Sequence, residues 1–169
     1  MIFSHCHRCG AAYGALDIFP KTCLACGHIH YRNPIPVAVA MVPCADGLLG
    51  VVRGIEPQRG VLALPGGFVD METAEQACSR ELFEESGVLL GSSVWRYASS
   101  YLTPTGNLLM FFEADVPPIA LPAFPYALPE GARVETEGFD VIRPGSKLAF
   151  PSHEAAAAAF RARLAARAT

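Results

Sequence analysis

The chain has 169 residues, of which 51% are hydrophobic, and its formal net charge is −3. This length suits one domain, or one domain with a small addition, and the hydrophobic content is sufficient for a buried core. The slight negative charge argues against non-specific binding to nucleic-acid backbones or acidic membranes. No apolar run approaches the roughly 20 residues of a membrane-spanning helix, and the first residues lack the apolar stretch of a secretory signal. We therefore expect a cytoplasmic protein.

Two pairs of cysteines near the N-terminus have the spacing of a metal site. Cys6 and Cys9 form one Cys-x-x-Cys-Gly motif, and Cys23 and Cys26 form a second. Each motif turns its two sulfurs toward one point, and the following glycine permits the tight turn. Four thiolates complete the tetrahedral shell of a structural Zn²⁺ and leave no position for a reacting water. The pattern predicts a zinc ribbon over residues 1–32 whose stability depends on the metal.

Disulfide bonds and a redox-active cysteine pair are the alternatives for this region. Disulfides are disfavoured in a chain without a secretion signal. A redox pair belongs at a strand-to-helix junction, and the sequence places neither pair at one. Four nearby histidines could replace a ligand, although four cysteines need no replacement: His5, His7, His28 and His30. Cys44 and Cys78 have no partner in the pattern, and we expect both to be small buried side chains.

The rest of the chain alternates apolar runs with turn residues. Residues 37–42, which follow two prolines, are apolar and rich in β-branched side chains, as in a buried strand. Further strands are predicted over residues 48–53, 94–101, 108–116 and 138–142. The proline-rich range 117–133 is expected to be an extended surface segment. One helix is predicted after Thr73, which can form a capping box with Gln76, and a second helix is predicted after Ser152 as N-cap, ending near Arg167.

Three carboxylates crowd about one turn of the first predicted helix. Glu81 lies three residues before Glu84 and four before Glu85, and at these spacings like charges on a helix repel one another. A hard divalent cation with oxygen ligands would offset this repulsion, and a solvated acidic surface is the alternative. The range Gly66–Gly67 allows a backbone to approach a phosphate closely, and Gly87 can end the helix in a left-handed cap. The segment predicts a metal site that acts on a phosphate.

Residues 66–88 resemble the signature of the Nudix hydrolases. That signature is Gly, five residues, Glu, seven residues, Arg-Glu, an aliphatic residue, any residue, Glu-Glu, any residue, Gly and an aliphatic residue. This chain fills it with Gly66, Glu72, Arg80, Glu81, Leu82, Glu84, Glu85, Gly87 and Val88. The resemblance implies an α+β fold over residues 33–169, an α/β/α sandwich with a mixed sheet. It also implies bound Mg²⁺ or Mn²⁺ and hydrolysis of a nucleoside diphosphate linked to another moiety.

The candidate metal site follows from this match. Glu81 and Glu85 lie one turn apart and are the best pair of ligands for Mg²⁺ or Mn²⁺, with Glu84 as the third. Backbone groups of Gly66–Gly67 would complete the shell, as the resemblance implies. Arg80 would steady the acids through a salt bridge with Glu72, and plain surface pairing is the alternative.

The general base and the phosphate ligands lie outside the signature. A glutamate of the signature or an acid just before the last strand could serve as the base. Among the latter, Glu137 is preferred to Glu135, and solvated loop acids are the alternative. Arg53 and Arg59 could bind phosphate with two parallel hydrogen bonds, and Arg53 is favoured because it ends a strand.

Resemblances outside the signature bear on the substrate. A zinc ribbon before a Nudix domain is typical of NADH pyrophosphatases, but residues 97–105 lack the Ser-Gln-Pro-Trp-Pro-Phe-Pro run of those enzymes. The chain is more similar to the group of the plant chloroplast FAD and ADP-ribose pyrophosphatase, through residues 31–34, 135–137 and 148–152. Leu62 stands where that group commonly has tryptophan. This resemblance implies cleavage of FAD or ADP-ribose to AMP and a phosphorylated product.

Other functions remain as alternatives. NADH pyrophosphatase is the alternative among enzymes. A non-catalytic nucleotide sensor would be expected to lose acids of the signature, and all are present. An RNA-directed, decapping-like protein would need a cationic ribbon, where only Arg8, Lys21 and Arg32 supply positive charge. We expect a small-molecule nucleotide as the partner, with neither membrane nor nucleic acid, and the sequence leaves a homodimer open.

Overall fold

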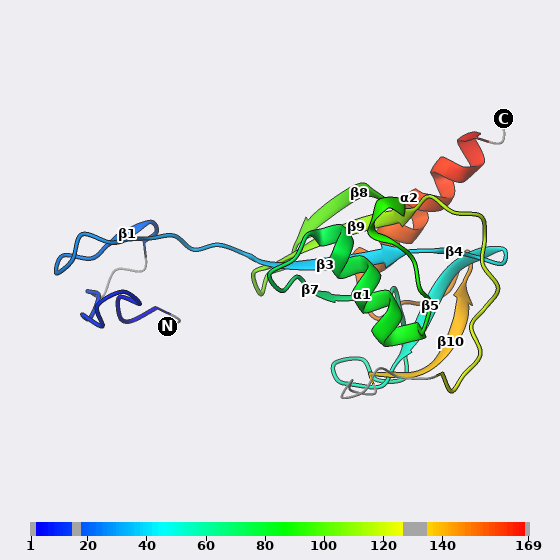
Figure 1. Ribbon diagram of the computed structural model, residues 1–169, viewed down its shortest axis with the longest axis horizontal. Helices are drawn as coiled ribbons and strands as arrows, with labels where there is room; N and C mark the ends of the chain where they lie inside the picture. Colours follow the sequence, from blue (N-terminus) through cyan, green and yellow to red (C-terminus); the bar gives the residue numbers. More distant parts are fainter. Residues whose placement is uncertain (1–2, 15–17, 127–134, 168–169) are drawn as a thin grey trace. The chain divides into compact units, whose positions relative to one another are not determined.

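The computed structural model describes residues 3–14, 18–126 and 135–167, with side chains as far as residue 164. The chain divides into two compact units, Met1–Pro34 and Ile35–Thr169. In the first unit β1 (Lys21–Thr22) pairs antiparallel with β2 (Ile29–His30) (Figure 1). Among the described residues, none of the helices combines the length and apolar character needed to cross a lipid bilayer.

The second unit contains two four-stranded sheets. In one sheet the order is β7 (Gly66–Phe68), β3 (Ile35–Met41), β9 (Asn107–Ala114) and β8 (Trp95–Leu102). In the other, β5 (Gly47–Arg53) lies between β10 (Thr136–Ile142) and β4 (Pro43–Cys44), and β6 (Leu62–Ala63) also pairs with β5. The pair β3 and β9 is parallel, whereas the other strand pairs are antiparallel, so the predicted mixed sheet is confirmed.

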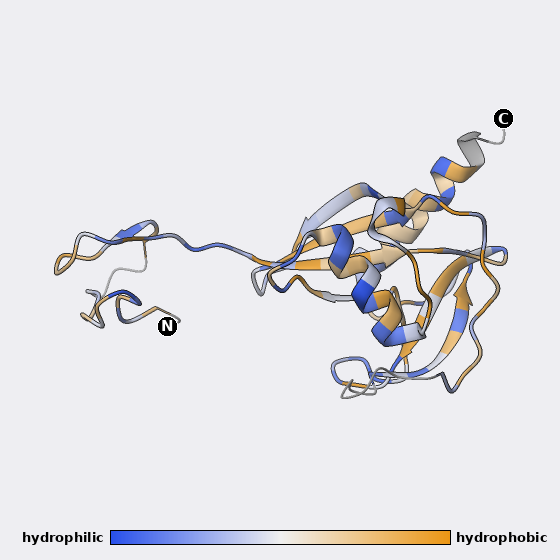
Figure 2. Ribbon diagram, in the orientation of Figure 1, coloured by the Kyte–Doolittle hydropathy of each residue, from blue (hydrophilic) through white to orange (hydrophobic). Residues whose placement is uncertain are grey.

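Two helices cover the sheet built around β3. Alternate side chains of a strand point to opposite faces. Ala38 and Ala40 therefore pack in one core cluster with Cys78 of α1 (Ala74–Ser86), whereas Val39 and Met41 pack in a second cluster with Phe160 of α2 (Pro151–Arg167). Figure 1 shows α1 and α2 on opposite sides of β3 and β9, and Figure 2 shows that these strands are mainly hydrophobic. The predicted α/β/α sandwich is confirmed.

The five predicted strands of this unit agree with β3, β5, β8, β9 and β10 to within two residues at each end. Cys44 and Cys78 are fully buried, as predicted. Three short strands, β4, β6 and β7, were not predicted, and the 3₁₀ turn η1 (Ser92–Val94) was not predicted either. Glycine and proline dominate β7 and its approach, and both are depleted in strands, so only the pairing of β7 with β3 reveals it.

The start of α2 differs from the prediction, and the proline-rich range 117–133 is described only in part. Ser152 is not the N-cap of α2, because the helix begins one residue earlier at Pro151. Proline is favoured at the first helical position, where its fixed φ suits the helix and its missing N–H is not needed. Of the proline-rich range 117–133, residues 127–133 lie outside the described residues. In the described part, Ile119 exchanges backbone hydrogen bonds with residues 43 and 45 and forms a parallel bridge with Cys44.

Candidate functional site

The ends of α1 are capped as the sequence predicts. The hydroxyl of Thr73 accepts a hydrogen bond from the Gln76 backbone N–H at 3.2 Å, and the Thr73 N–H donates to the Gln76 side chain at 2.9 Å. At the other end Gly87 has a left-handed φ of 70°, and its N–H donates to the Phe83 carbonyl at 2.8 Å. These caps set the start and the phase of the helix, and therefore the face on which its three glutamates lie.

The two glycines of β7 bring a bare backbone against α1 and β3. A Cβ atom at Gly66 would overlap the carbonyl of Ala38 on the neighbouring strand β3. A Cβ atom at Gly67 would overlap the carboxylate of Glu81. A side chain at either position would force a neighbouring group to move. At Gly66 the obstacle is a backbone, whereas at Gly67 it is the end of a flexible side chain.

This difference separates the effects of two substitutions. We expect Gly67→Ala to lower the turnover number at least about tenfold with little change in melting temperature, because the Glu81 carboxylate must move while the backbone stays. Gly66→Ala, the matched variant, is expected to destabilise the protein, because β7 must separate from β3. Steady-state kinetics and thermal unfolding of the two variants measure both effects. Equal losses of stability in the two would contradict the assignment of Gly67 to the site.

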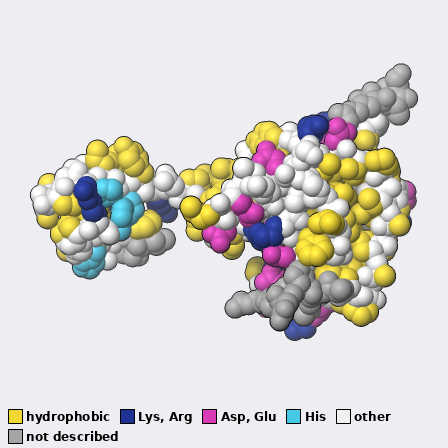
Figure 3. Space-filling model, viewed as in Figure 1, with side chains coloured by type: hydrophobic (Ala, Val, Ile, Leu, Met, Phe, Trp, Pro, Cys, Tyr) yellow, Lys and Arg dark blue, Asp and Glu magenta, His cyan; other side chains and the backbone are white. Residues whose placement is uncertain are grey.

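Arg80 holds the acidic face of α1 together. Its Nε and Nη2 donate to Glu72 Oε1 at 2.9 and 2.6 Å, which confirms the predicted salt bridge. Its Nη1 donates to Glu81 at 2.7 Å and to Glu84 at 3.2 Å, and Nη2 also donates to the Phe68 carbonyl. Burial by itself would lower the pKa of Arg80, but the hydrogen bonds to Glu72 and Glu81 outweigh it and raise the pKa. Figure 3 shows acidic and basic side chains gathered over α1.

Glu85 is held apart from this arginine. Its Oε2 accepts a hydrogen bond from the Gly66 N–H at 2.9 Å. Burial raises the pKa of Glu85 to about 8, and the negative charges of Glu81 and Glu135 act in the same direction. Burial also raises the pKa of Glu81, with a contribution from Glu84. Burial disfavours the charged form of a carboxyl group, and a bound cation would offset this cost and favour the carboxylate.

The carboxylates suit a divalent cation in their chemistry, but their oxygens do not converge. Among the described residues, one set of three or more His, Cys, Asp or Glu side chains has its ligand atoms within 4.8 Å of one another, and that set is the four cysteines. Arg80 draws Glu81 and Glu84 to itself, whereas the Gly66 N–H holds Glu85. Hard oxygen donors and unrelieved negative charge both fit Mg²⁺ or Mn²⁺. The ligand roles of Glu81, Glu84 and Glu85 stay predictions.

The two acids at the start of the last strand have different surroundings: Glu135 precedes β10, whereas Glu137 lies within it and not before it as predicted from the sequence. Glu137 accepts hydrogen bonds from the Nε of Arg59, at 2.8 Å, and from its Nη2. The charge of Glu135, by contrast, contributes to the raised pKa of both Glu81 and Glu85. Glu135 is therefore the one of the two whose charge acts on the signature glutamates, whereas Glu137 is paired with Arg59. The role of either acid as the general base stays a prediction.

A cavity of about 630 Å³ adjoins the glycine pair. Its lining includes Arg53, Gly67, Glu85, Tyr101, Phe150 and His153. Arg53 donates through Nε to the Pro57 carbonyl at 2.8 Å, and its guanidinium carbon lies 5.1 Å from the centre of the Phe150 ring. Contact with phosphate therefore remains a prediction for Arg53. Phe150 and His153 were not predicted as site residues, because the fold, and no local motif, brings the start of α2 beside β7.

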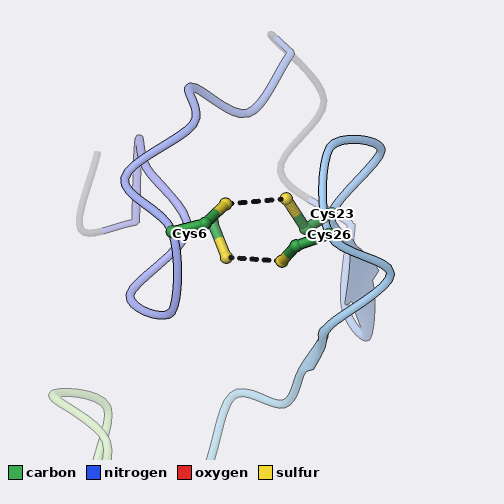
Figure 4. Close-up of side chains that lie close together, drawn as sticks. Cys6, Cys23 and Cys26 are labelled. Carbon is green, nitrogen blue, oxygen red and sulfur yellow. Dashed lines mark hydrogen bonds between the residues drawn. The ribbon is translucent and has the colours of Figure 1, made fainter.

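The N-terminal cysteines form a second candidate metal centre. All four sulfur atoms lie within 4.8 Å of one another, with 3.8 Å between Cys6 and Cys26 and 3.6 Å between Cys9 and Cys23 (Figure 4). These separations exclude disulfide bonds, which need about 2.05 Å. They match the edge of about 3.8 Å expected for a tetrahedron with Zn–S bonds of about 2.3 Å.

The backbone explains how the two cysteine motifs reach this arrangement. The N–H groups of Gly10 and Gly27 donate to the carbonyls of Cys6 and Cys23, each at 2.8 Å. Both glycines have a left-handed φ, of 74° and 70°. The two turns therefore have the same conformation, and the four-cysteine set fits the predicted zinc ribbon.

Comparisons with known proteins place this chain in a family. The sequence model of the NUDIX domain matches residues 34–141. The NAD-capped RNA hydrolase NudC of Photobacterium profundum is 31% identical over 114 residues, which are 66% of this chain and 42% of that protein. The ADP-ribose pyrophosphatase of Methanocaldococcus jannaschii is 33% identical over 90 residues, 51% of this chain and 53% of that protein. The chain thus spans about half or less of the length of these curated relatives.

Solved structures share the fold. A NUDIX hydrolase from Nitrosomonas europaea superposes with a TM-score of 0.66 at 23% identity, over 91% of this chain and 88% of that chain. The NUDIX domain of Shewanella oneidensis NrtR, solved with ADP ribose, gives a TM-score of 0.60 at 20% identity, over 79% of this chain and 90% of that chain. The family match covers more than half of the residues and contains the capped helix with its glutamates and the glycine pair. This chain therefore belongs to the NUDIX domain family.

Proposed function

We propose that this chain is a Nudix hydrolase that cleaves the pyrophosphate of a nucleoside diphosphate linked to another moiety. One observation carries the proposal. The glutamate face of α1 lies against the bare backbone of Gly66–Gly67 at the edge of a 630 Å³ cavity. Carboxylates for cations, a backbone that can approach phosphate and a space for an organic group are thus adjacent, as such a reaction requires.

The reaction is attack of water on one phosphorus and rupture of a P–O bond of the anhydride bridge. Glu81, Glu84 and Glu85 would hold Mg²⁺ or Mn²⁺, which when bound neutralises charge on the phosphate oxygens. Arg80 keeps Glu81 and Glu84 in position through its hydrogen bonds. A carboxylate beside these acids would accept the proton of the water. Of Glu135 and Glu137, Glu135 is proposed for this task because its charge acts on Glu81 and Glu85.

The choice between the two candidate bases is testable with a matched pair. We expect Glu135→Gln to lower the turnover number at least about a hundredfold, because a general base contributes a factor of this order. Glu137→Gln removes the partner of an exposed arginine and is expected to change turnover less than about threefold. Steady-state rates at saturating Mg²⁺ measure both. A larger loss in Glu137→Gln than in Glu135→Gln would restore Glu137 as the base.

ADP-ribose and FAD are the proposed substrates, with AMP and a phosphorylated product released. A relative named as an ADP-ribose pyrophosphatase supports ADP-ribose, and the sequence resemblance to the chloroplast group supports FAD. NAD(H), or RNA carrying an NAD cap, is the second candidate, because several relatives are named as NAD-capped RNA hydrolases. The first unit is proposed to bind a structural Zn²⁺ through Cys6, Cys9, Cys23 and Cys26.

A hydrolysis screen tests this proposal. The protein would be incubated with Mg²⁺ or Mn²⁺ and with FAD, ADP-ribose, NADH, NAD, NAD-capped RNA, dinucleoside polyphosphates or nucleoside triphosphates, and the products identified by mass. Release of AMP from ADP-ribose or FAD at the highest kcat/KM is the expected result. Preference for NADH or capped RNA would replace the lead substrate with the second candidate. Absence of metal-dependent turnover across the panel would overturn the proposed function.

A further inference from the structure

His153 occupies the first turn of α2 and has no role in the chemistry described above. Its side chain is 6% exposed and lines the cavity beside the glycine pair. The imidazole lies edge-on to the rings of Phe111, at 5.7 Å, and Phe150, at 5.1 Å between ring centres. A histidine so enclosed must have its polar atoms satisfied or directed toward the remaining open space.

One ring nitrogen is used by the protein. Nδ1 accepts a hydrogen bond from the Leu64 N–H at 3.1 Å, and so carries no proton. Burial, followed by the positive charge of Arg53, lowers the pKa of His153 to about 4, so the ring is neutral at pH 7. The single proton of the neutral imidazole is therefore on Nε2, which is a hydrogen-bond donor.

The other ring nitrogen, Nε2, is accessible. Among the described residues, none accepts a hydrogen bond from Nε2. Nε2 is also not one of the enclosed side-chain atoms that lack a partner, which are Tyr13 Oη, His30 Nδ1, Thr136 Oγ1 and Arg161 Nη1. An atom that is neither bonded nor enclosed is accessible, and the open space on which His153 borders is the cavity.

The cavity walls suit a flat, apolar ring that carries an acceptor. Phe150, with Arg53 above it, offers a stacking surface, and Val39 and Leu109 add apolar wall. A nucleobase presents two apolar faces and has ring nitrogens or carbonyl oxygens at its edge. With Glu85 in the same lining, a base in the cavity leaves its phosphates near the glutamates of α1.

We propose that His153 is a specificity-determining residue whose Nε2–H donates a hydrogen bond to an acceptor on the edge of the substrate's nucleobase. At the same time its Nδ1 accepts the hydrogen bond from the Leu64 N–H. Leu64 lies two residues before Gly66, and the Gly66 N–H donates a hydrogen bond to Glu85. This inference rests on the proposed function for the identity of the ligand. It adds the group that recognises the base and the place where the base binds.

Two substitutions separate the two nitrogens. In His153→Asn the side-chain oxygen lies as many bonds from Cβ as Nδ1 and can still accept from Leu64, but no donor reaches the position of Nε2. In His153→Gln the side-chain amide reaches the position of Nε2, whereas the acceptor for Leu64 is lost. The first variant tests recognition, and the second tests the structural contact.

Binding is measured by calorimetry without added Mg²⁺ or Mn²⁺ with two probes, AMP and ribose 5-phosphate, which lacks the base. The Kd of ribose 5-phosphate divided by the Kd of AMP reports how much the base contributes to binding. We expect His153→Asn to reduce this ratio about tenfold with a melting temperature near that of wild type, because a buried donor is lost. His153→Gln is expected to lower the melting temperature and to reduce the ratio less.

Some outcomes would overturn the inference, and others would overturn the proposed function. An unchanged ratio in His153→Asn, or equal weakening of AMP and ribose 5-phosphate, would overturn the inference, because a purely structural role weakens both probes alike. Binding without added Mg²⁺ or Mn²⁺ requires no turnover. If the protein binds AMP in a way that depends on His153 but shows no hydrolase activity, the proposed function is overturned and the inference about His153 stands. Metal-dependent hydrolysis with a ratio indifferent to His153→Asn would overturn the inference alone.

Discussion

Replacement of Glu85 by glutamine is expected to lower the turnover number at least about a hundredfold while the fold is retained. The proposed role of Glu85 is to ligate the catalytic cation, and an amide oxygen is a much weaker ligand for Mg²⁺ than a carboxylate. The amide oxygen can still accept the hydrogen bond from the Gly66 N–H, so the contact between α1 and β7 persists. Because burial and neighbouring acids raise the pKa of Glu85, removal of its charge is expected not to destabilise the metal-free protein.

The measurement combines kinetics with thermal unfolding. Turnover would be measured at saturating substrate over a range of Mg²⁺ concentrations, and the melting temperature would be measured without added Mg²⁺ or Mn²⁺. Glu75→Gln, a change of the same kind in the first turn of the same helix, is the control and is expected to retain its rate. Activity near wild type in Glu85→Gln would remove Glu85 from the site. A large fall in melting temperature would assign it a structural role instead.

Cys23→Ser is expected to remove Zn²⁺ from the first unit and to unfold that unit. A unit of this size buries little surface, and Cys6 and Cys23 are among its few buried side chains. Three thiolates and a neutral hydroxyl bind Zn²⁺ much more weakly than four thiolates, and the free energy of metal binding is the free energy of folding for such a unit. The zinc content is expected to fall from about one ion per chain to near zero.

Elemental analysis after dialysis measures the zinc, and limited proteolysis measures the folding of residues 3–34. Cys44→Ser is the matched control, because Cys44 is fully buried in the second unit and is not one of the four clustered thiols. The control is expected to keep its full complement of zinc even if its core is less stable. A full complement of zinc in Cys23→Ser would refute the four-cysteine site.

Features that depend on near neighbours in the chain could be predicted from the sequence. The capping box of Thr73 and Gln76, the left-handed cap at Gly87 and the shared helix face of the glutamates all arise within one helix. The cysteine turns close within five residues, through the hydrogen bond from the Gly10 N–H to the Cys6 carbonyl. Spacing alone specifies such features, because 3.6 residues per helical turn and the geometry of a tight turn are local properties.

Features that join distant segments could be identified only from the tertiary structure. The hydrogen bond from Leu64 to His153 spans 89 positions, and the contact of Arg59 with Glu137 spans 78. The charge of Glu135 acts on Glu85, whereas Glu137 pairs with Arg59, and neither relation can be read from the sequence. A single sequence does not show how helices and strands pack on one another, and that packing places the start of α2 beside the strand that carries Gly66. The motifs proposed to bind metal can therefore be recognised in the sequence. The cavity, and the place of His153 in its wall, arise only when packing brings separate strands and helices together.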